Sequence, residues 1–412
     1  GAGVTVSGVE NVKVNAVTLT TVDAALMTGV TDFYNNGSLS DITVNSAGFI
    51  PNVHVTSSSS DTTVNVDATT RVGSSDSATI ALTGASLTSA STVTMNGIET
   101  FNVAASGAAS GSSTLSTTLA SDTLKTVAIS GDASSNITVN LVGATTADAG
   151  SVTGSDATNR VDLTADAADT ISVDLGKGDD KLTISNISAT HTLAGGDGTD
   201  TLDSSAAITT TTGANISGFE KATVGAVSVA LPTAGNTITD VTFSSDGGTL
   251  AGLAAGGSVT QALAGSNTVS NTTGWTGTSD AITVNVGSAL AAGAFTQSLT
   301  ATGIETATIT NTEISTTNSA RTVGVTSANL TTATVTSAGT GTITFVGGGT
   351  AMTELDMSGV SGATAFTAST TNTKSTGFTF KAGAKASTLT GLTGADTLVG
   401  GAGADTITGA TG

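Results

Sequence analysis

The sequence predicts an all-β protein, built as an elongated parallel β-helix or β-roll solenoid with very little helix. The alphabet is narrow: only 3% of the 412 residues are aromatic and two are proline, whereas a globular core of this length normally uses more large side chains. Short runs of Thr, Val and Ile favour strands, and the Gly, Asn, Asp and Ser clusters between them favour turns. Glycine–aspartate patterns also recur, which is typical of rungs that stack only on their neighbours.

Residues 1–174 are expected to form a first, irregular parallel β-helix. β-branched alternations such as those at 42–45, 63–66 and 126–129 are separated by turn-forming clusters without a strict period. This irregular spacing predicts rungs of variable length. A β-sandwich would show the same strands, and the repeats further along the chain are what favours the β-helix.

Residues 175–203 carry two copies of the pattern Gly-x-Gly-x-Asp-x-(apolar), which predict calcium-binding β-roll rungs. Glycines let the backbone bend so that carbonyl oxygens point inward, the aspartate supplies a carboxylate oxygen, and the apolar residue begins a short strand. Because calcium takes about six to eight oxygen ligands, two stacked turns must share an ion. The candidate ligands are Gly176, Gly178, Asp179 and Asp180 in the first copy and Gly196, Asp197, Gly198, Asp200 and Asp203 in the second.

The spacing of these copies tests the interpretation. Turns on the same side of a regular roll recur about every 18 residues. Asp180 and Asp200 are 20 residues apart, so we expect a rung with two extra residues that still stacks. Lys177 and Lys181 are expected to point to solvent. The alternative is a pair of Gly-Asp surface turns that bind no ion.

Residues 204–380 repeat the strand–turn pattern and are expected to form a second β-helix stack. Asp280, in the turn Gly277-Thr278-Ser279-Asp280, is a further candidate calcium ligand. Short helices are expected only at Val22–Met27 and Ala251–Leu263, as caps or crossovers.

A motif Gly-(apolar)-Glu precedes a strand at four places and uses four of the six glutamates of the chain: Glu10, Glu99, Glu220 and Glu305. No partner acid or histidine recurs at a fixed distance from it, which argues against catalysis. We expect these glutamates to satisfy backbone amides where a new β-helix stack begins.

Residues 381–412 are expected to begin a second calcium-binding array, with Gly394, Asp396, Gly401, Gly403 and Asp405 as candidate ligands. Asp396 and Asp405 are nine residues apart and should lie on opposite sides of the roll. Their same-side partners 18 residues earlier are Phe378 and Ser387, and neither is a carboxylate. We therefore expect incomplete or weak calcium sites here, and the chain reads as a fragment of a longer repeat array.

Charge and composition limit the function. The net charge is −20, which argues against binding to nucleic acid or anionic membranes. Cysteine is absent, so neither disulfides nor thiolate zinc sites are available. Calcium is the obvious candidate for stabilising the fold in their place. The two histidines, His54 and His191, are far apart, and His191 is expected at the surface. The sequence contains no His-Glu-x-x-His motif, which zinc proteases of this type need. It is also poor in the Arg, Tyr and His residues that sugar-active enzymes use beside paired carboxylates. We therefore expect no enzyme.

Three segments carry a resemblance to a known family. They are Ser130-Gly131-Asp132-Ala133, the segment Ile216-Ser217-Gly218-Phe219-Glu220 soon after the 195–203 repeat, and the 276–280 turn followed by Gly303-Ile304-Glu305-Thr306. In these segments and their order, residues 110–412 resemble bacterial surface-layer proteins that carry calcium-binding nonapeptide (RTX) repeats. Residues 1–109 share only the general strand–turn character of this family.

The resemblance implies an extended parallel β-helix, several structural Ca²⁺ ions and a homo-oligomeric, hexameric lattice at the cell surface. It further implies secretion by the type I route and contact with lipopolysaccharide through a helical anchoring domain, to which nothing in this sequence is similar. Membrane insertion and nucleic acid are not expected. The alternatives are a calcium-dependent secreted adhesin and, less favoured, a polysaccharide-active β-helix enzyme.

Overall fold

Two compact units make up the chain. The computed structural model describes residues 5–58, 60–83, 91–106, 115–141, 149–165, 168–225, 228–231, 237–253, 256–261, 265–270, 275, 277–286, 295–311, 321–339, 341–368 and 377–409. The first unit comprises Gly1–Ser204 with Asn215–Phe219, and the second comprises Ser205–Ala214 with Glu220–Gly412. The stretch 175–203 lies within the first unit, and 381–412 lies within the second.

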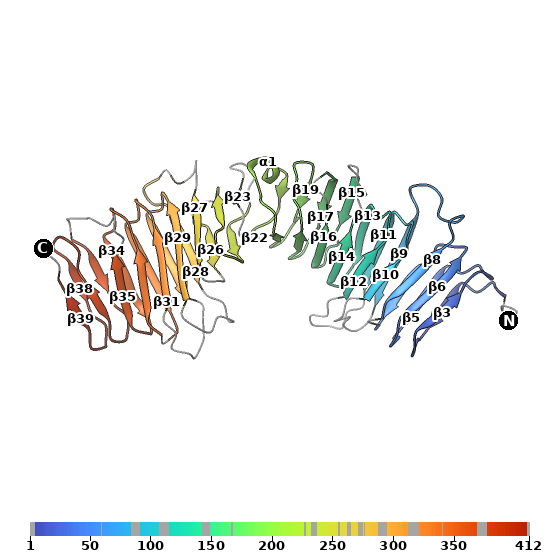
Figure 1. Ribbon diagram of the computed structural model, residues 1–412, viewed down its shortest axis with the longest axis horizontal. Coiled ribbons are helices and arrows are strands. Elements are labelled where there is room, and N and C mark those ends of the chain that lie inside the picture. The colour runs from blue at the N-terminus through green and yellow to red at the C-terminus, as the bar shows by residue number, and fades with distance from the viewer. Residues whose placement is uncertain are drawn as a thin grey trace. The chain divides into compact units, whose positions relative to one another are not determined.

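The first unit is a parallel β-solenoid in which successive strands alternate between two sheets (Figure 1). One sheet contains β2 (Asn11–Val14), β5 (Asp32–Asn36), β7 (Asn52–Thr56), β9 (Ser77–Thr83), β11 (Thr100–Ser106), β13 (Thr126–Gly131), β15 (Ala149–Thr153), β17 (Thr170–Asp174), β19 (Thr192–Ala194) and β21 (Ile216–Ser217). The other contains β3 (Thr20–Asp23), β6 (Ile42–Ala47), β8 (Thr62–Val66), β10 (Ser91–Thr94), β12 (Leu115–Ala120), β14 (Ser135–Asn140), β16 (Asn159–Thr164), β18 (Lys181–Ile184) and β20 (Thr201–Ser204). The short strands β1 (Val6–Ser7) and β4 (Met27–Thr28) form a separate parallel pair.

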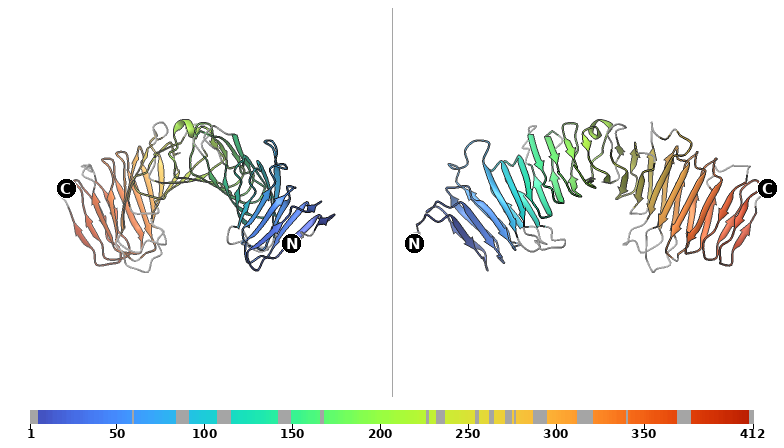
Figure 2. Two further views of the ribbon diagram at one scale, coloured as in Figure 1. Left: turned by 45° about the vertical axis from the view of Figure 1, so that its right-hand side comes forward. Right: turned by 180° about the vertical axis from the view of Figure 1, so that it is seen from behind.

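The second unit has the same construction, and its strands are visible from both sides in Figure 2. One sheet contains β22 (Lys221–Val224), β24 (Asp240–Phe243), β26 (Ser258–Gln261), β28 (Ala281–Val286), β30 (Thr306–Asn311), β32 (Thr332–Ser337), β34 (Glu354–Val360), β36 (Thr379–Lys381) and β38 (Thr397–Val399). The other contains β23 (Ser228–Ala230), β25 (Thr249–Ala251), β27 (Gly265–Ser270), β29 (Phe295–Thr302), β31 (Arg321–Thr326), β33 (Ile343–Gly347), β35 (Thr364–Ala368), β37 (Thr388–Thr390) and β39 (Thr406–Thr408).

The core consists of apolar columns that run through the rungs. Alternate residues of each strand point inward, so Val161, Leu182 and Leu202 stack in register and are fully buried. Burying one such side chain stabilises the fold by about 1.5–3 kcal/mol. Small and medium side chains therefore suffice for a core, because each rung fills only the narrow space between two sheets. This confirms the predicted all-β parallel solenoid.

One short helix, α1 (Thr210–Gly213), is present in the part of the chain that the structure describes. The expected helix at Val22–Met27 is wrong, because β3 continues to Asp23 and β4 begins at Met27. Of the expected segment Ala251–Leu263, residues 254–255 and 262–263 lie outside the described residues, and β25 and β26 occupy much of the remainder.

The Gly-(apolar)-Glu motif forms the same turn each time. Its glycine has a positive φ at Gly8, Gly97, Gly218 and Gly303. The carbonyl oxygen of each glutamate accepts two consecutive backbone N–H groups of a following rung. In addition, the carboxylates of Glu99 and Glu305 each accept a backbone N–H one rung earlier, at 2.8 Å, which confirms the expected role of these two side chains.

The expectation that the motif begins a new stack is wrong at Glu99 and Glu305. Strand β11 pairs with both β9 and β13, and β30 pairs with both β28 and β32. The motif is therefore a turn within a continuing ladder.

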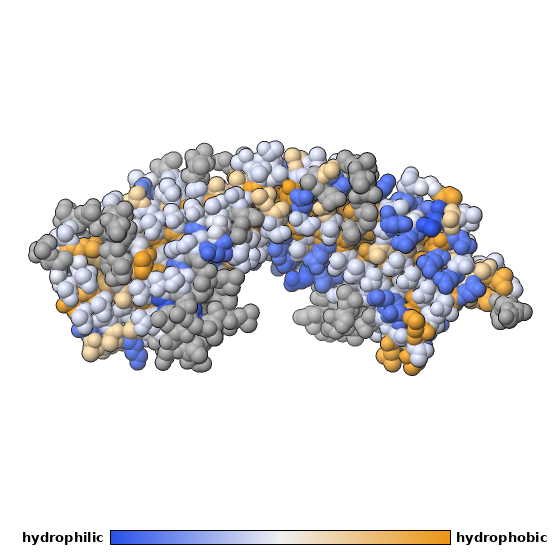
Figure 3. All heavy atoms as spheres, viewed as in Figure 1, coloured by the Kyte–Doolittle hydropathy of each residue, from blue (hydrophilic) through white to orange (hydrophobic). Residues whose placement is uncertain are grey.

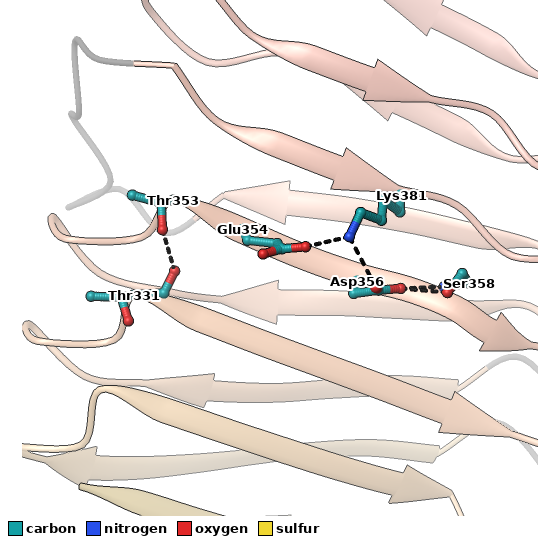
Figure 4. A network of polar contacts seen from close by, with 6 residues as sticks. All are labelled: Thr331, Thr353, Glu354, Asp356, Ser358 and Lys381. Carbon is teal, nitrogen blue, oxygen red and sulfur yellow. Dashed lines mark hydrogen bonds and ion pairs between the residues drawn. The ribbon is translucent and has the colours of Figure 1, made fainter. Parts of the chain in front are cut away.

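The face seen in Figure 3 is mostly of intermediate hydropathy, with scattered hydrophilic and hydrophobic residues. On the second unit, the Lys381 ammonium contacts the carboxylate of Glu354 at 2.5 Å and that of Asp356 at 3.3 Å (Figure 4). These contacts raise the pKa of Lys381, the hydrogen bond to Glu354 most of all. Burial acts to raise the pKa of Asp356, but hydrogen bonds from Ser358 and the charge of Lys381 outweigh burial and hold that pKa below its usual range.

Candidate metal centre

Four turns lie one above another at the starts of β14, β16, β18 and β20 in the first unit. They are residues 131–135, 155–159, 176–180 and 196–200. The strand register aligns Ser135 with Asn159 and Lys181 with Thr201, so the last residues of the turns follow one another from rung to rung. The predicted 20-residue rung between Asp180 and Asp200 is confirmed.

Glycine is required in the last two turns because the backbones lie in contact. Gly196 has a φ of +111°, and a Cβ atom there would lie 1.9 Å from the carbonyl oxygen of Gly176. A Cβ at Gly198, whose φ is +139°, would lie 1.9 Å from the carbonyl oxygen of Gly178. Only glycine permits both the left-handed φ and this approach. The carbonyl groups of Gly176 and Gly178 are thereby held against the next turn.

The last residues of the four turns form a buried polar column: Ser135, Asn159, Asp180 and Asp200, none more than 2% exposed. The backbone N–H of Asn159 donates to Asp180 Oδ1 at 2.6 Å. The N–H of Asp180 donates to Asp200 Oδ1 at 2.7 Å. Each carboxylate is thus fixed by the rung before it, and two acidic side chains are buried one rung apart.

One carboxylate oxygen of this column lacks a hydrogen-bond donor among the described residues. Among the described residues, Asp180 Oδ2 has no hydrogen-bond partner, although it is inaccessible to solvent. Burial raises the pKa of Asp180 to about 7, and the neighbouring Asp200 and Asp179 carboxylates add to that increase against the lowering effect of Asn159. A buried carboxylate oxygen without a donor is unfavourable unless it is protonated or paired with a cation.

The column fits a hard cation such as calcium, which prefers carboxylate and carbonyl oxygens. Asp180, Asp200 and the carbonyl groups of Gly176 and Gly178 would hold it. In the part of the chain that is described, no three His, Asp or Glu side chains converge on one point. The donor set therefore depends on backbone carbonyls as well as on the two carboxylates.

The other candidates of the 175–203 stretch lie outside this column. Asp179 and Asp197 are exposed, and Asp179 Oδ1 accepts the N–H of Thr199 at 2.9 Å. Asp203 lies on the outward face of β20, where the ammonium of Lys181 contacts its carboxylate at 2.6 Å. Lys177 is exposed and pairs with Asp156 at 3.0 Å. Both lysines lie on the solvent side, as expected.

The C-terminal candidates follow an 18-residue register. The N–H of Phe378 donates to Asp396 Oδ1 and that of Ser387 to Asp405 Oδ1, each at 2.9 Å. Asp396 precedes β38 and Asp405 precedes β39, so the two lie on different sheets, as the nine-residue spacing predicts.

The backbone explains the glycines among these candidates, by a positive φ at Gly394 and by close approach to the preceding rung at Gly401 and Gly403. Gly394 has a φ of +121°. A Cβ at Gly401 would lie 1.5 Å from the carbonyl oxygen of Gly383, and one at Gly403 would lie 2.2 Å from the backbone nitrogen of Ala386. Asp396 and Asp405 have no carboxylate in the rung before them, so these turns offer fewer acidic oxygens than Asp180 and Asp200 do.

Asp280 lies in the second unit and is half-buried. Its Oδ2 accepts the N–H of Gly277 at 3.1 Å, and its own N–H donates to Glu305 Oε2 at 2.8 Å. Asp280 therefore closes its own turn, and its neighbour one rung on is the Gly-Ile-Glu motif.

One of the two histidines differs from expectation. His191 is 1% exposed, so the expected surface position is wrong. Its Nδ1 accepts the N–H of Ser188 at 3.3 Å, which folds the ring back over its own turn. His54 stacks on Tyr34 with ring centroids 4.1 Å apart, and its Nε2 lies 2.7 Å from Asp32 Oδ1.

Comparison with known proteins identifies calcium-binding repeats at the C-terminal end of the chain. Residues 382–412 match the model of the RTX calcium-binding nonapeptide repeat (4 copies). No curated protein matches the chain. Among the described residues, no helix is long and apolar enough to cross a membrane. The fold and these repeats define a parallel β-solenoid with RTX repeats, which bind calcium and are typical of secreted, extracellular proteins.

Sequence reasoning missed the turn at 155–159. It reads Ser155-Asp156-Ala157-Thr158-Asn159, without the two glycines and with Asn in place of the final Asp. The apolar Val161 two residues after Asn159, matching Leu182 after Asp180, is the signal that could have found it.

Proposed function

We propose that the chain is a structural component of a calcium-dependent two-dimensional surface-layer lattice on a Gram-negative bacterium. The observation that carries this proposal is the buried Asp180 oxygen without a donor, held between stacked glycine turns in a chain that also has C-terminal RTX repeats. Such a site is favourable only with a cation or a proton. The proposal includes secretion by the type I route and no enzymatic activity.

The mechanism is linkage between metal binding and folding. Calcium binds the stacked turns and not the unfolded chain, so it stabilises the folded state. Extracellular calcium modules have dissociation constants of roughly 10⁻⁴–10⁻³ M, and at tenfold excess each site then contributes about 1.4 kcal/mol. With a net charge of −20, bound cations also reduce repulsion between copies.

Electron microscopy of the full chain tests the lattice. We expect ordered sheets at millimolar calcium and dispersed particles after chelation with EGTA. Particles that stay dispersed while circular dichroism reports a calcium-loaded fold would contradict the lattice and favour a secreted adhesin. Release of reducing sugar from a polysaccharide panel would instead indicate a β-helix enzyme.

A further inference from the structure

The side chain of Asn159 lies in a cage of oxygen atoms. Its Nδ2 is 2.6 Å from the carbonyl oxygen of Ala157, 3.2 Å from that of Leu175 and 3.3 Å from that of Ser155. It is also 3.4 Å from Asp180 Oδ1. An amide NH₂ has two hydrogens, so four oxygens share one partly positive group.

The orientation of this amide is fixed from the other side. Its Oδ1 accepts hydrogen bonds from the hydroxyls of Ser135 and Ser155, each at 3.1 Å. Hydroxyl donors on one end of the amide place the NH₂ on the other end, toward the cage. Asn159 is fully buried, so no water competes for these contacts.

The strand register places an equivalent turn one rung further along the solenoid. The register places Asp180 at the position of Asn159, and Gly176 and Gly178 at the positions of Ser155 and Ala157. The carboxylate oxygen Asp180 Oδ2 replaces the amide nitrogen. It has no hydrogen to donate and no hydrogen-bond partner among the described residues. A positive charge beside this oxygen would therefore take the place of the hydrogens that the Asn159 amide supplies.

We propose that the Asn159 amide is a built-in substitute for a metal ion: it satisfies the oxygen cage between the 155–159 and 176–180 turns without calcium, whereas Asp180 leaves the next cage to be filled by calcium. Asn159 thus ends the calcium array on its N-terminal side and holds the 155–159 turn closed at any calcium concentration. This inference rests on the proposed calcium binding at Asp180 and Asp200.

The test is a gain of function. Asn159→Asp replaces the NH₂ by an oxygen and should create one more calcium site. Native mass spectrometry of the full chain, titrated with CaCl₂, should count one ion more than in the wild type. Asp180→Asn makes the opposite exchange and should count one ion fewer.

Stability provides the second measurement. In EGTA, Asn159→Asp should unfold at a lower urea concentration than the wild type, and millimolar calcium should restore the midpoint. Asn159→Ala is the matched control, because it loses the hydrogen bonds without adding a carboxylate and should be destabilised equally with and without calcium. A variant that fails to fold in EGTA is refolded in calcium before counting.

The outcomes separate the two ideas. If the wild type binds calcium and Asn159→Asp binds the same number of ions, the inference is overturned and the new carboxyl carries a proton. If the wild type and Asp180→Asn both bind the same number of ions, the proposed site at Asp180 is overturned instead.

Discussion

Asn159 and Asp180 occupy equivalent positions in successive rungs, and one atom separates their chemistry. The amide donates to a cage of carbonyl oxygens, while the carboxylate presents an oxygen without a donor. If the proposed calcium site is correct, the identity of the last residue of each turn decides whether that rung binds calcium.

Asp180→Asn should remove the calcium response at this rung while keeping the turn folded. Removing an unpaired buried oxygen should raise the free energy of unfolding in EGTA by about 1–3 kcal/mol. Urea unfolding with and without calcium measures both effects. Asp162→Asn, an equal change of charge on the exposed face of β16, should leave both nearly unchanged, and equal effects of the two substitutions would contradict the assignment.

The raised pKa of Asp180 predicts a pH dependence with a definite sign. The folded state holds a proton on Asp180 up to a pKa of about 7, against an ordinary value of 3.8 for aspartate. Without calcium, this carboxyl therefore stabilises the fold at low pH, and that contribution is lost as the pH rises through about 4 to 7. Calcium affinity should rise over the same interval because binding displaces the proton.

Chemical denaturation in EGTA at pH 5 and pH 8 measures this contribution. Comparison with Asp180→Asn isolates it from the acids whose pKa values are lowered, such as Asp32 and Asp356. The difference between pH 5 and pH 8 should be smaller in the variant, and an unchanged difference would count against Asp180 as its source.

Single residues also mark the limits of sequence reading. Asp180 and Asp200 could be predicted because glycines and a carboxylate recur at recognisable spacing. Asn159 does not follow from that pattern, because its turn lacks both glycines and the final acid, and only the apolar Val161 marks it. The position of His191 beside the calcium stretch predicts a surface residue, yet a hydrogen bond to its own turn allows the ring to be buried.

At the scale of elements, the turns fix the register and the strands follow. Gly196→Ala should destabilise the first unit by at least about 2 kcal/mol, since alanine disfavours positive φ and its Cβ would meet the Gly176 carbonyl. Gly48→Ala is the matched control, because no atom lies within 4 Å of its Cβ position. Thermal unfolding followed by circular dichroism measures both, and equal melting temperatures would contradict the close-contact argument.

Charged side chains on the outward faces should contribute less to stability than the close glycine contacts do. Lys381→Ala removes the contacts between β36 and β34 shown in Figure 4 and leaves Glu354 and Asp356 to repel each other. Because these groups are partly exposed, the expected loss of stability is about 1 kcal/mol or less, and it should shrink at high salt. Lys385→Ala, at an exposed lysine, serves as control, and salt-independent losses would contradict an electrostatic origin.

For the whole molecule, calcium should act as a specific ligand and not as ionic strength. EGTA should lower the β-strand signal in circular dichroism, and calcium should restore it. Magnesium at equal concentration should restore less, because it demands a smaller octahedral site and gives up its water reluctantly. Full recovery with magnesium or sodium chloride would indicate simple charge screening of the −20 chain.

The fold class could be predicted from composition, because a chain of Thr, Val and Gly with few aromatic residues can build a core only in thin rungs. The pairing of particular strands could not be predicted. Stacked partners lie 18 residues apart at Phe378 and Asp396, 24 at Ser135 and Asn159, and 26 at Ser91 and Thr117. A variable period hides the register from any search for a fixed repeat.

That variable period has a practical meaning. The strands keep their register while the distance along the chain changes, so the extra residues are absorbed where the chain turns. A short peptide inserted at a turn between two strands, such as 67–76 between β8 and β9, should therefore leave the strand ladder intact. Turn length in this solenoid can therefore change while the strand ladder and its apolar core stay the same.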